Sequence, residues 1–117
     1  SDDDFASYPP RSPFHEQGLL RPHVVWFGEA LPEEALRAAA LASESCGVFI
    51  SIGTSAAVYP AAGFVRVAAM NGAYTAEINA DATPISRAVD LSLRGRSGEI
   101  LPRVVDAVAT ALDSLSA

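Results

Sequence analysis

The segment that most constrains the fold of this chain is the apolar run Val48–Ile52, with the sequence VFISI. A continuous apolar run of this length is typical of a strand that is buried on both faces of a parallel sheet. A helix is predicted before the run, because Pro32 and the two glutamates after it favour a helix start and Gly47 favours a helix end. The turn Gly53-Thr54-Ser55 follows the run at once.

The rest of the chain continues the alternation of strands and helices. Strands are predicted at residues 23–27, 74–78 and 90–93 from short apolar runs rich in β-branched or aromatic residues. Helices are predicted at residues 61–70 and from Pro102 onwards, where apolar residues recur on one side. Such alternation implies parallel pairing and right-handed crossovers. We therefore predict a small α/β protein with a Rossmann-like, three-layer parallel sheet.

Length and composition indicate one domain that binds neither nucleic acid nor membranes. With 117 residues the chain is too short for two ordinary domains. Residues 1–18 are acidic and proline-rich, which predicts an extended arm, and residues 19–117 form the predicted domain. A net charge of -6 disfavours binding to phosphate backbones, and no apolar run is long enough to span a membrane. Cys46 is the only cysteine, so an internal disulfide is impossible and a reducing, cytoplasmic location is expected.

Polar residues and glycines follow the predicted strands, at the carboxyl ends where parallel sheets usually bind ligands. These groups are Gly53-Thr54-Ser55, Asn79-Ala80-Asp81 and Ser97. Hydroxyls and free backbone N–H groups can hold a phosphate or ribose oxygen, and Asn79 can bond ribose hydroxyls. Each group also fits an ordinary strand-to-helix turn, Asx-turn or glycine turn. From these residues alone, a nucleotide site and a set of ordinary turns both remain open.

Four segments of the chain, taken together, follow the patterns of one known family. Residues 21–32 follow R-P-x-V-V-x-F-G-E-x-(L/M)-P, and residues 52–62 contain G-T-S-x-x-V-x-P-A. Glu77-Ile78-Asn79 follows the step (E/I)-(I/L)-N, and residues 95–102 follow the turn G-x-(A/S)-(G/S)-E-(I/V)-(L/V)-P. In this order and spacing they resemble the sirtuins, the NAD-dependent protein lysine deacylases. The resemblance covers roughly residues 18–113 and implies the C-terminal half of a sirtuin-type NAD-binding domain.

The resemblance implies a binding site for the cofactor NAD. By resemblance, the turn Gly53-Thr54-Ser55 contacts the phosphate and ribose portion of NAD. Asn79 bonds the adenosine ribose, Ala80 and Asp81 line that part of the site, and Ser97 lies against the adenine. These roles are implied by the family, and the resemblance favours a nucleotide site over ordinary turns.

The resemblance also implies a cleft for an acyl-lysine protein or peptide. By resemblance, Val58 lies near the acyl-lysine channel. An extended segment pairs with the peptide by strand addition, and its residues are Val25, Trp26, Phe27, Gly28 and Glu29.

Several parts of the sirtuin pattern are absent from this chain. The pyrophosphate turn G-A-G-x-S, the Q-N-x-D segment and the H-G dipeptide with the general-base histidine are expected upstream of the first residue. The zinc module's C-x-x-C pair is missing from residues 12–22, where Ser12 and His15 keep only the spacing. We therefore expect no catalytic residue and no zinc, and a chain that is inactive alone and acts with a complementary N-terminal half.

Two other functions for this chain remain open from the sequence, and the missing upstream half has one physical consequence. The chain could be a non-catalytic nucleotide- or protein-binding module, or the remnant of a truncated reading frame. In the family fold, the strand at Val48–Ile52 pairs with a strand of the upstream half. Without that partner the apolar edge is exposed, which predicts a homodimer or coverage by the proline-rich arm.

Overall fold

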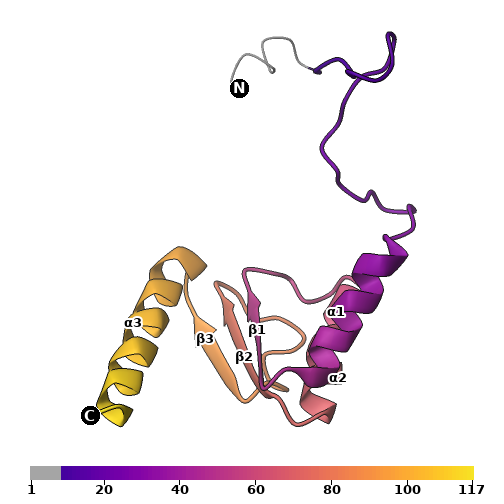
Figure 1. Cartoon of the computed structure of the whole chain (residues 1–117). Helices are drawn as coiled ribbons and strands as arrows, with labels where there is room; N and C mark the ends of the chain where they lie inside the picture. The colour runs from indigo at the N-terminus through magenta and orange to yellow at the C-terminus, as the bar shows by residue number, and fades with distance from the viewer. Residues whose placement is uncertain (1–8) are drawn as a thin grey trace. The chain divides into compact units, whose positions relative to one another are not determined.

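The computed structural model describes residues 9–117, which fall into two compact units (Figure 1). The first unit extends to Glu33, and the second runs from Glu34 to Ala117. The first eight residues of the predicted arm lie outside the described residues. The boundary expected between residues 18 and 19 stays a prediction.

The first unit is irregular, and the strand predicted at residues 23–27 is absent from it. Residues 10–20 close into a small loop, in which Arg11 forms an isolated antiparallel bridge with Leu19. The Ser12 amide donates to the Gly18 carbonyl at 2.8 Å, so this part of the predicted arm is not extended. Further on, the Trp26 amide donates to the Glu29 carboxylate at 3.0 Å. Local turns of this kind use backbone groups that a strand would give to a neighbour.

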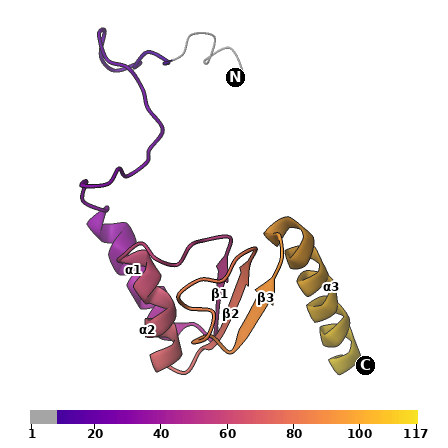
Figure 2. The same ribbon diagram turned by 180° about the vertical axis from the view of Figure 1, so that it is seen from behind.

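The second unit is a three-stranded parallel sheet with helices, which confirms the predicted α/β, Rossmann-like class. Figures 1 and 2 show α1 and α2 on one side of the sheet and α3 on the other. The strand order is β1-β2-β3, and both pairs are parallel. The elements are α1 (Glu33–Ser45), β1 (Val48–Ile52), the 3-10 turn η2 (Ala61–Gly63), α2 (Phe64–Met70), β2 (Tyr74–Asn79), β3 (Leu91–Arg94) and α3 (Ser97–Leu115).

The core surrounds the central strand β2, and β1 is an edge strand. Ala76 and Ile78 of β2 are buried together with Val65 and Ala68 of α2. The prediction that the strand Val48–Ile52 is buried on both faces is wrong for this unit. Val48, Ile50 and Ile52, which share one face of this edge strand, are 57%, 45% and 40% exposed.

The last helix starts earlier than predicted. α3 begins at Ser97, and Pro102 lies inside it. Arg96 precedes the helix in an extended conformation and its carbonyl accepts from the amides of Glu99 and Ile100. Glu99 lies in the first turn, where its negative charge interacts favourably with the helix dipole and stabilises the helix. Over the described residues, no helix combines the length and the apolar character that crossing a bilayer requires.

Candidate functional site

The turns that follow the three strands meet at one edge of the sheet. The Gly53 amide donates to the Ile78 carbonyl at 2.9 Å, and the Gly95 amide donates to the Asn79 carbonyl at 3.1 Å. A Cβ atom placed on Gly53 would lie 3.5 Å from the Ser97 hydroxyl oxygen. The structure thus brings together the three groups that the sequence singled out, because parallel strands place their carboxyl ends on the same edge.

Glycine is required at two of these turns. Gly53 has a φ angle of +61° and Gly95 one of +147°, both of which L side chains rarely adopt. A Cβ atom at Gly95 would also lie 2.9 Å from Cγ1 of Ile100. At Gly53 the missing side chain leaves the backbone open beside Ser97, where a ligand could approach closely.

Asn79 is held by a backbone carbonyl at the end of β2. Its Nδ2 atom donates a hydrogen bond to the Asp81 carbonyl at 3.0 Å. The Arg94 guanidinium donates to the same carbonyl at 2.7 Å. Asn79 is half-buried, while Ala80 and Asp81 are exposed. The turn after β2 therefore presents an ordered amide beside two residues that face solvent.

Next to this turn lies a buried carboxylate, Glu77, which in the sequence is recognisable only as the first residue of the family step Glu77-Ile78-Asn79. The Glu77 side chain is 1% exposed. Its carboxylate accepts hydrogen bonds from Ser86 at 2.7 Å, from Ser92 at 2.9 Å and from Thr83, and the Arg94 guanidinium lies at 3.4 Å. The only sequence signal was a glutamate in an otherwise uncharged buried strand, followed by Thr and Ser residues.

Hydrogen bonding keeps Glu77 ionised despite its burial. Burial alone would raise the pKa of Glu77. The hydroxyls of Thr83, Ser86 and Ser92 and the charge of Arg94 outweigh it, and the pKa lies below its ordinary value. An ionised carboxylate can accept from several donors at once, which suits this surrounding of hydroxyls.

A second carboxylate pins β3 to β2 at the opposite end of the sheet. The backbone amide and the hydroxyl of Thr75 both donate to Asp90 Oδ2, at 2.7 and 2.8 Å. The bond from the Thr75 amide is the main cause that holds the pKa of Asp90 below its ordinary value. Because Thr75 is the second residue of β2 and Asp90 directly precedes β3, this contact lies away from the carboxyl edge.

Two apolar hollows flank the end of β1. One, of about 340 Å³, is lined by Thr54, Val58 and residues of α2. The other, of about 560 Å³, is lined by Ser97, Leu101 and further residues of α3. Ile52 lines both hollows, and the Thr54 hydroxyl accepts from the Ala56 amide at 3.3 Å. Ser55 lies between these residues and is exposed.

The predicted peptide-binding segment belongs to the first unit, whereas Val58 and the groups at the strand ends belong to the second. Trp26 and Phe27 are 63% and 93% exposed, and Gly28 adopts a φ angle of +91°. Val25 is half-buried. Glu29 accepts from the Trp26 amide, which is the main cause that lowers its pKa, and pairs with Arg21 at 3.2 Å. The segment is thus a turn stabilised by Glu29.

Metal ligands do not gather in the part of the chain that the structure describes. Within residues 9–117, no group of three or more His, Cys, Asp and Glu side chains could hold a metal ion. Cys46 is half-buried, and its Sγ atom lies 3.5 Å from the Ser43 carbonyl.

A parallel α/β sheet with glycine turns and polar side chains at its carboxyl edge is an architecture of the Rossmann-like class. Residues 7–60 match the Sir2 family. The "NAD-dependent protein deacylase 2" of Pyrobaculum aerophilum is 50% identical over 91 residues, which are 78% of this chain and 36% of that protein.

Solved structures agree with the sequence comparison. A Sir2 homologue in complex with NAD is 43% identical with a TM-score of 0.79, and the match covers 88% of this chain and 40% of that one. A Sir2 complex with a p53 peptide and NAD+ is 30% identical with a TM-score of 0.75, covering 91% of this chain and 44% of the other. The chain therefore belongs to the Sir2 family, the sirtuins. It spans less than half the length of these relatives.

Proposed function

We propose that this chain carries the adenosine side of a sirtuin NAD site, and that the activity it serves is the NAD-dependent removal of acyl groups from protein lysines. The observation that supports this most is the convergence of Gly53, Asn79 and Ser97 at the carboxyl edge of the sheet. When bound, NAD supplies the ADP-ribose to which the acyl group is transferred.

The residues at this edge fit the adenosine and phosphate portions of NAD. The turn Gly53-Thr54-Ser55 offers hydroxyls and a backbone free of Cβ at its first residue, which suits phosphate and ribose oxygens. Asn79 bonds the adenosine ribose, with Ala80 and Asp81 lining the site. Ser97 lies against the adenine, beside the hollow of about 560 Å³ under α3.

The peptide side of the proposal concerns residues 25–29 and Val58. The exposed side chains of Trp26 and Phe27 leave this segment open to a partner, and strand addition would require Glu29 to release the Trp26 amide. Val58 lines the hollow of about 340 Å³ beside Thr54, which suits an acyl chain. The Sir2 structure with a p53 peptide supports a peptide partner for this family.

Catalysis is not assigned to any residue of this chain. Neither His15 nor His23 lies in a family motif for the general base, and we propose that the chain turns over substrate only with a complementary N-terminal half. We propose no zinc for this chain and a cytoplasmic location, in keeping with its single cysteine.

Asn79→Ala should weaken the binding of ADP-ribose to the chain about tenfold, because the variant loses a hydrogen bond to the ribose. Isothermal titration calorimetry with NAD and with ADP-ribose measures this difference. Asn71→Ala is the matched control, since Asn71 is the only other asparagine and its amide bonds the Val67 carbonyl at the end of α2. This control should bind like the unchanged chain.

Two results would contradict the proposal. Absence of binding heat with both ligands would remove the NAD site from this chain. In a second arm, the chain is incubated with NAD and an acetyl-lysine peptide, and released nicotinamide is measured. No turnover is expected, and sustained turnover would show that the chain needs no complementary half.

The exposed edge of β1 is, we propose, covered in the working protein by a second copy or by the complementary half. The chain alone should then be a dimer in light scattering, because exposed apolar edges associate. Ile50→Lys should shift it to a monomer, since a charge on an edge strand opposes strand pairing. Met70→Lys, at an exposed position at the end of α2, should leave the dimer intact. A monomeric unchanged chain would rule out a second copy as the partner of this edge.

A further inference from the structure

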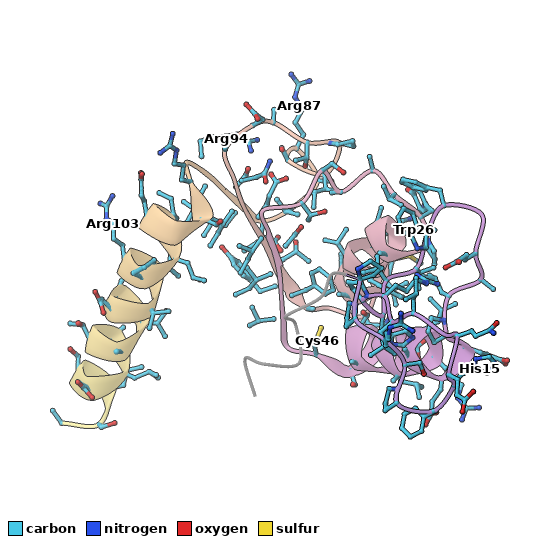
Figure 3. The ribbon with its side chains drawn as sticks, turned by 90° about the horizontal axis from the view of Figure 1, so that it is seen from above. His15, Trp26, Cys46, Arg87, Arg94 and Arg103 are labelled. Carbon is cyan, nitrogen blue, oxygen red and sulfur yellow. The ribbon has the colours of Figure 1, made fainter. Side chains whose placement is uncertain are left out.

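We propose that Arg94 is a positioning residue that orients the Asn79 amide, so that its oxygen Oδ1 accepts a hydrogen bond from a hydroxyl of the adenosine ribose. The inference rests on the proposed NAD site and assigns a hydrogen-bond direction and a supporting cation to it. Arg94 lies outside the residues assigned to that site above. Figure 3 shows it beside the start of α3.

The direction follows from the two bonds to the Asp81 carbonyl. A carbonyl oxygen has two lone pairs, and here Asn79 Nδ2 and the Arg94 guanidinium donate to them, at 3.0 and 2.7 Å. In an asparagine side chain, the amide nitrogen and the amide oxygen lie on opposite sides of the line that continues the Cβ–Cγ bond. With Nδ2 bound to Asp81, the Oδ1 atom of Asn79 faces away from that carbonyl and is available as an acceptor.

The Arg94 head group is fixed by a buried partner. Its Nη1 atom lies 3.4 Å from Glu77 Oε2, and the Glu77 carboxylate is itself held by Ser86 and Ser92. Glu77 cannot rotate away without leaving those hydroxyls unpaired in the interior. The guanidinium is thus fixed between a buried carboxylate and the Asp81 carbonyl, while 40% of the Arg94 side chain remains exposed.

If Arg94 positions Asn79, its loss should weaken only those ligands that carry the ribose hydroxyl. A merely structural role would weaken all ligands alike. Without Arg94, the Asp81 carbonyl loses the donor that holds it in place, so its bond to the Asn79 amide no longer fixes the orientation of that amide. The chain then loses its preference for a ribose hydroxyl, but keeps its contacts to the adenine and phosphates. Only ligands that carry the hydroxyl are weakened.

The test is calorimetric titration of the 117-residue chain with ADP, 2′-deoxy-ADP and 3′-deoxy-ADP. The unchanged chain should bind ADP about tenfold more tightly than at least one of the deoxy ligands, as expected for one hydrogen bond. In Arg94→Met this ratio should fall to about one, with the affinity for the deoxy ligand nearly unchanged. Arg94→Lys should keep part of the ratio. Arg103→Met is the matched control, because Arg103 points away from the sheet (Figure 3).

A spectroscopic readout checks the amide orientation without any ligand. The chain has two asparagines and one glutamine, so its ¹⁵N spectrum contains only three side-chain amide pairs. The Asn79→Ala spectrum identifies the Asn79 pair by its absence. In Arg94→Met this pair should move towards the shifts of a solvent-exposed amide, while the Asn71 pair stays in place.

Each outcome separates this inference from the proposed function. If the unchanged chain binds none of the ligands, the NAD site is overturned and this inference with it. If it binds with the expected preference and Arg94→Met keeps that preference, only the role of Arg94 is overturned. Equal weakening of all three ligands also overturns it. Should Arg94→Met fail to fold by circular dichroism, Arg94→Lys decides, since an unchanged preference and an unmoved Asn79 signal would contradict the inference.

Discussion

Glu77→Ala should lower the free energy of unfolding of this chain by about 3 kcal/mol, which is the scale for leaving three partly buried hydroxyl donors without their acceptor. The Glu77 side chain is 1% exposed, and Ser86 and Ser92 would lose their shared acceptor in the interior. The guanidinium of Arg94 would also lose its counter-charge. Urea unfolding followed by circular dichroism measures the difference.

The control for this variant is Glu44→Ala, at an exposed position on α1. That change should alter the free energy of unfolding by less than about 0.5 kcal/mol. Glu77→Gln should lie between the two, because an amide keeps the size of the side chain and loses its charge. A loss below about 1 kcal/mol in Glu77→Ala would show that the hydroxyls find other partners.

The pH dependence of the same variants gives the sign of the charge effect. The pKa of Glu77 in the folded chain lies below its ordinary value of 4.5, so its ionised form stabilises the fold. This contribution is present above pH 4.5 and is lost as the pH falls through the lower folded pKa. Below pH 4.5, the stability difference between the unchanged chain and Glu77→Gln should therefore shrink.

Gly95→Ala should also cost about 3 kcal/mol, from two sources. The φ angle of +147° is strained for any residue with a Cβ atom. The new Cβ would lie 2.9 Å from Cγ1 and 3.0 Å from Cδ1 of Ile100, so β3 and the start of α3 would be forced apart. Thermal unfolding of the variant measures the sum of both costs.

Substitutions at two other glycines distinguish the cost of the backbone angle from the cost of the contact with Ile100. Gly72→Ala has the same problem of backbone angle, with φ at +87°, but its Cβ would meet nothing within 4 Å, so about 1 kcal/mol is expected. Gly98→Ala lies in α3, has no positive φ and no close neighbour, and should be neutral or stabilising. If Gly95→Ala costs no more than Gly72→Ala, the contact with Ile100 is not a clash.

Sequence patterns predicted the positions of the three sheet strands well, because apolar runs between turn residues decide where strands form. The run Val48–Ile52 became β1 with the same bounds, and β2 extends one residue beyond the predicted strand. The meeting of Gly53, Asn79 and Ser97 followed from parallel topology alone. Their proposed ligand contacts came from family resemblance.

The remaining features depend on contacts that periodicity does not contain. The strand expected at residues 23–27 is a turn, because the Glu29 carboxylate binds the Trp26 amide. The Glu77 network draws its hydroxyls from a loop and from β3, six to fifteen residues further along the chain. The orientation of Asn79 depends on Arg94, which a sequence pattern gives no means to place.

The pairing of Glu77 with Ser92 has a consequence for the accuracy with which the chain assembles. The two residues are direct neighbours across β2 and β3. If β3 docked one residue out of step, every one of its side chains would point to the opposite face, and Ser92 would turn away from the carboxylate. The misaligned sheet would then enclose a charge with fewer donors. This polar cluster therefore favours a single alignment of β3 beside β2, next to the edge where the nucleotide is proposed to bind.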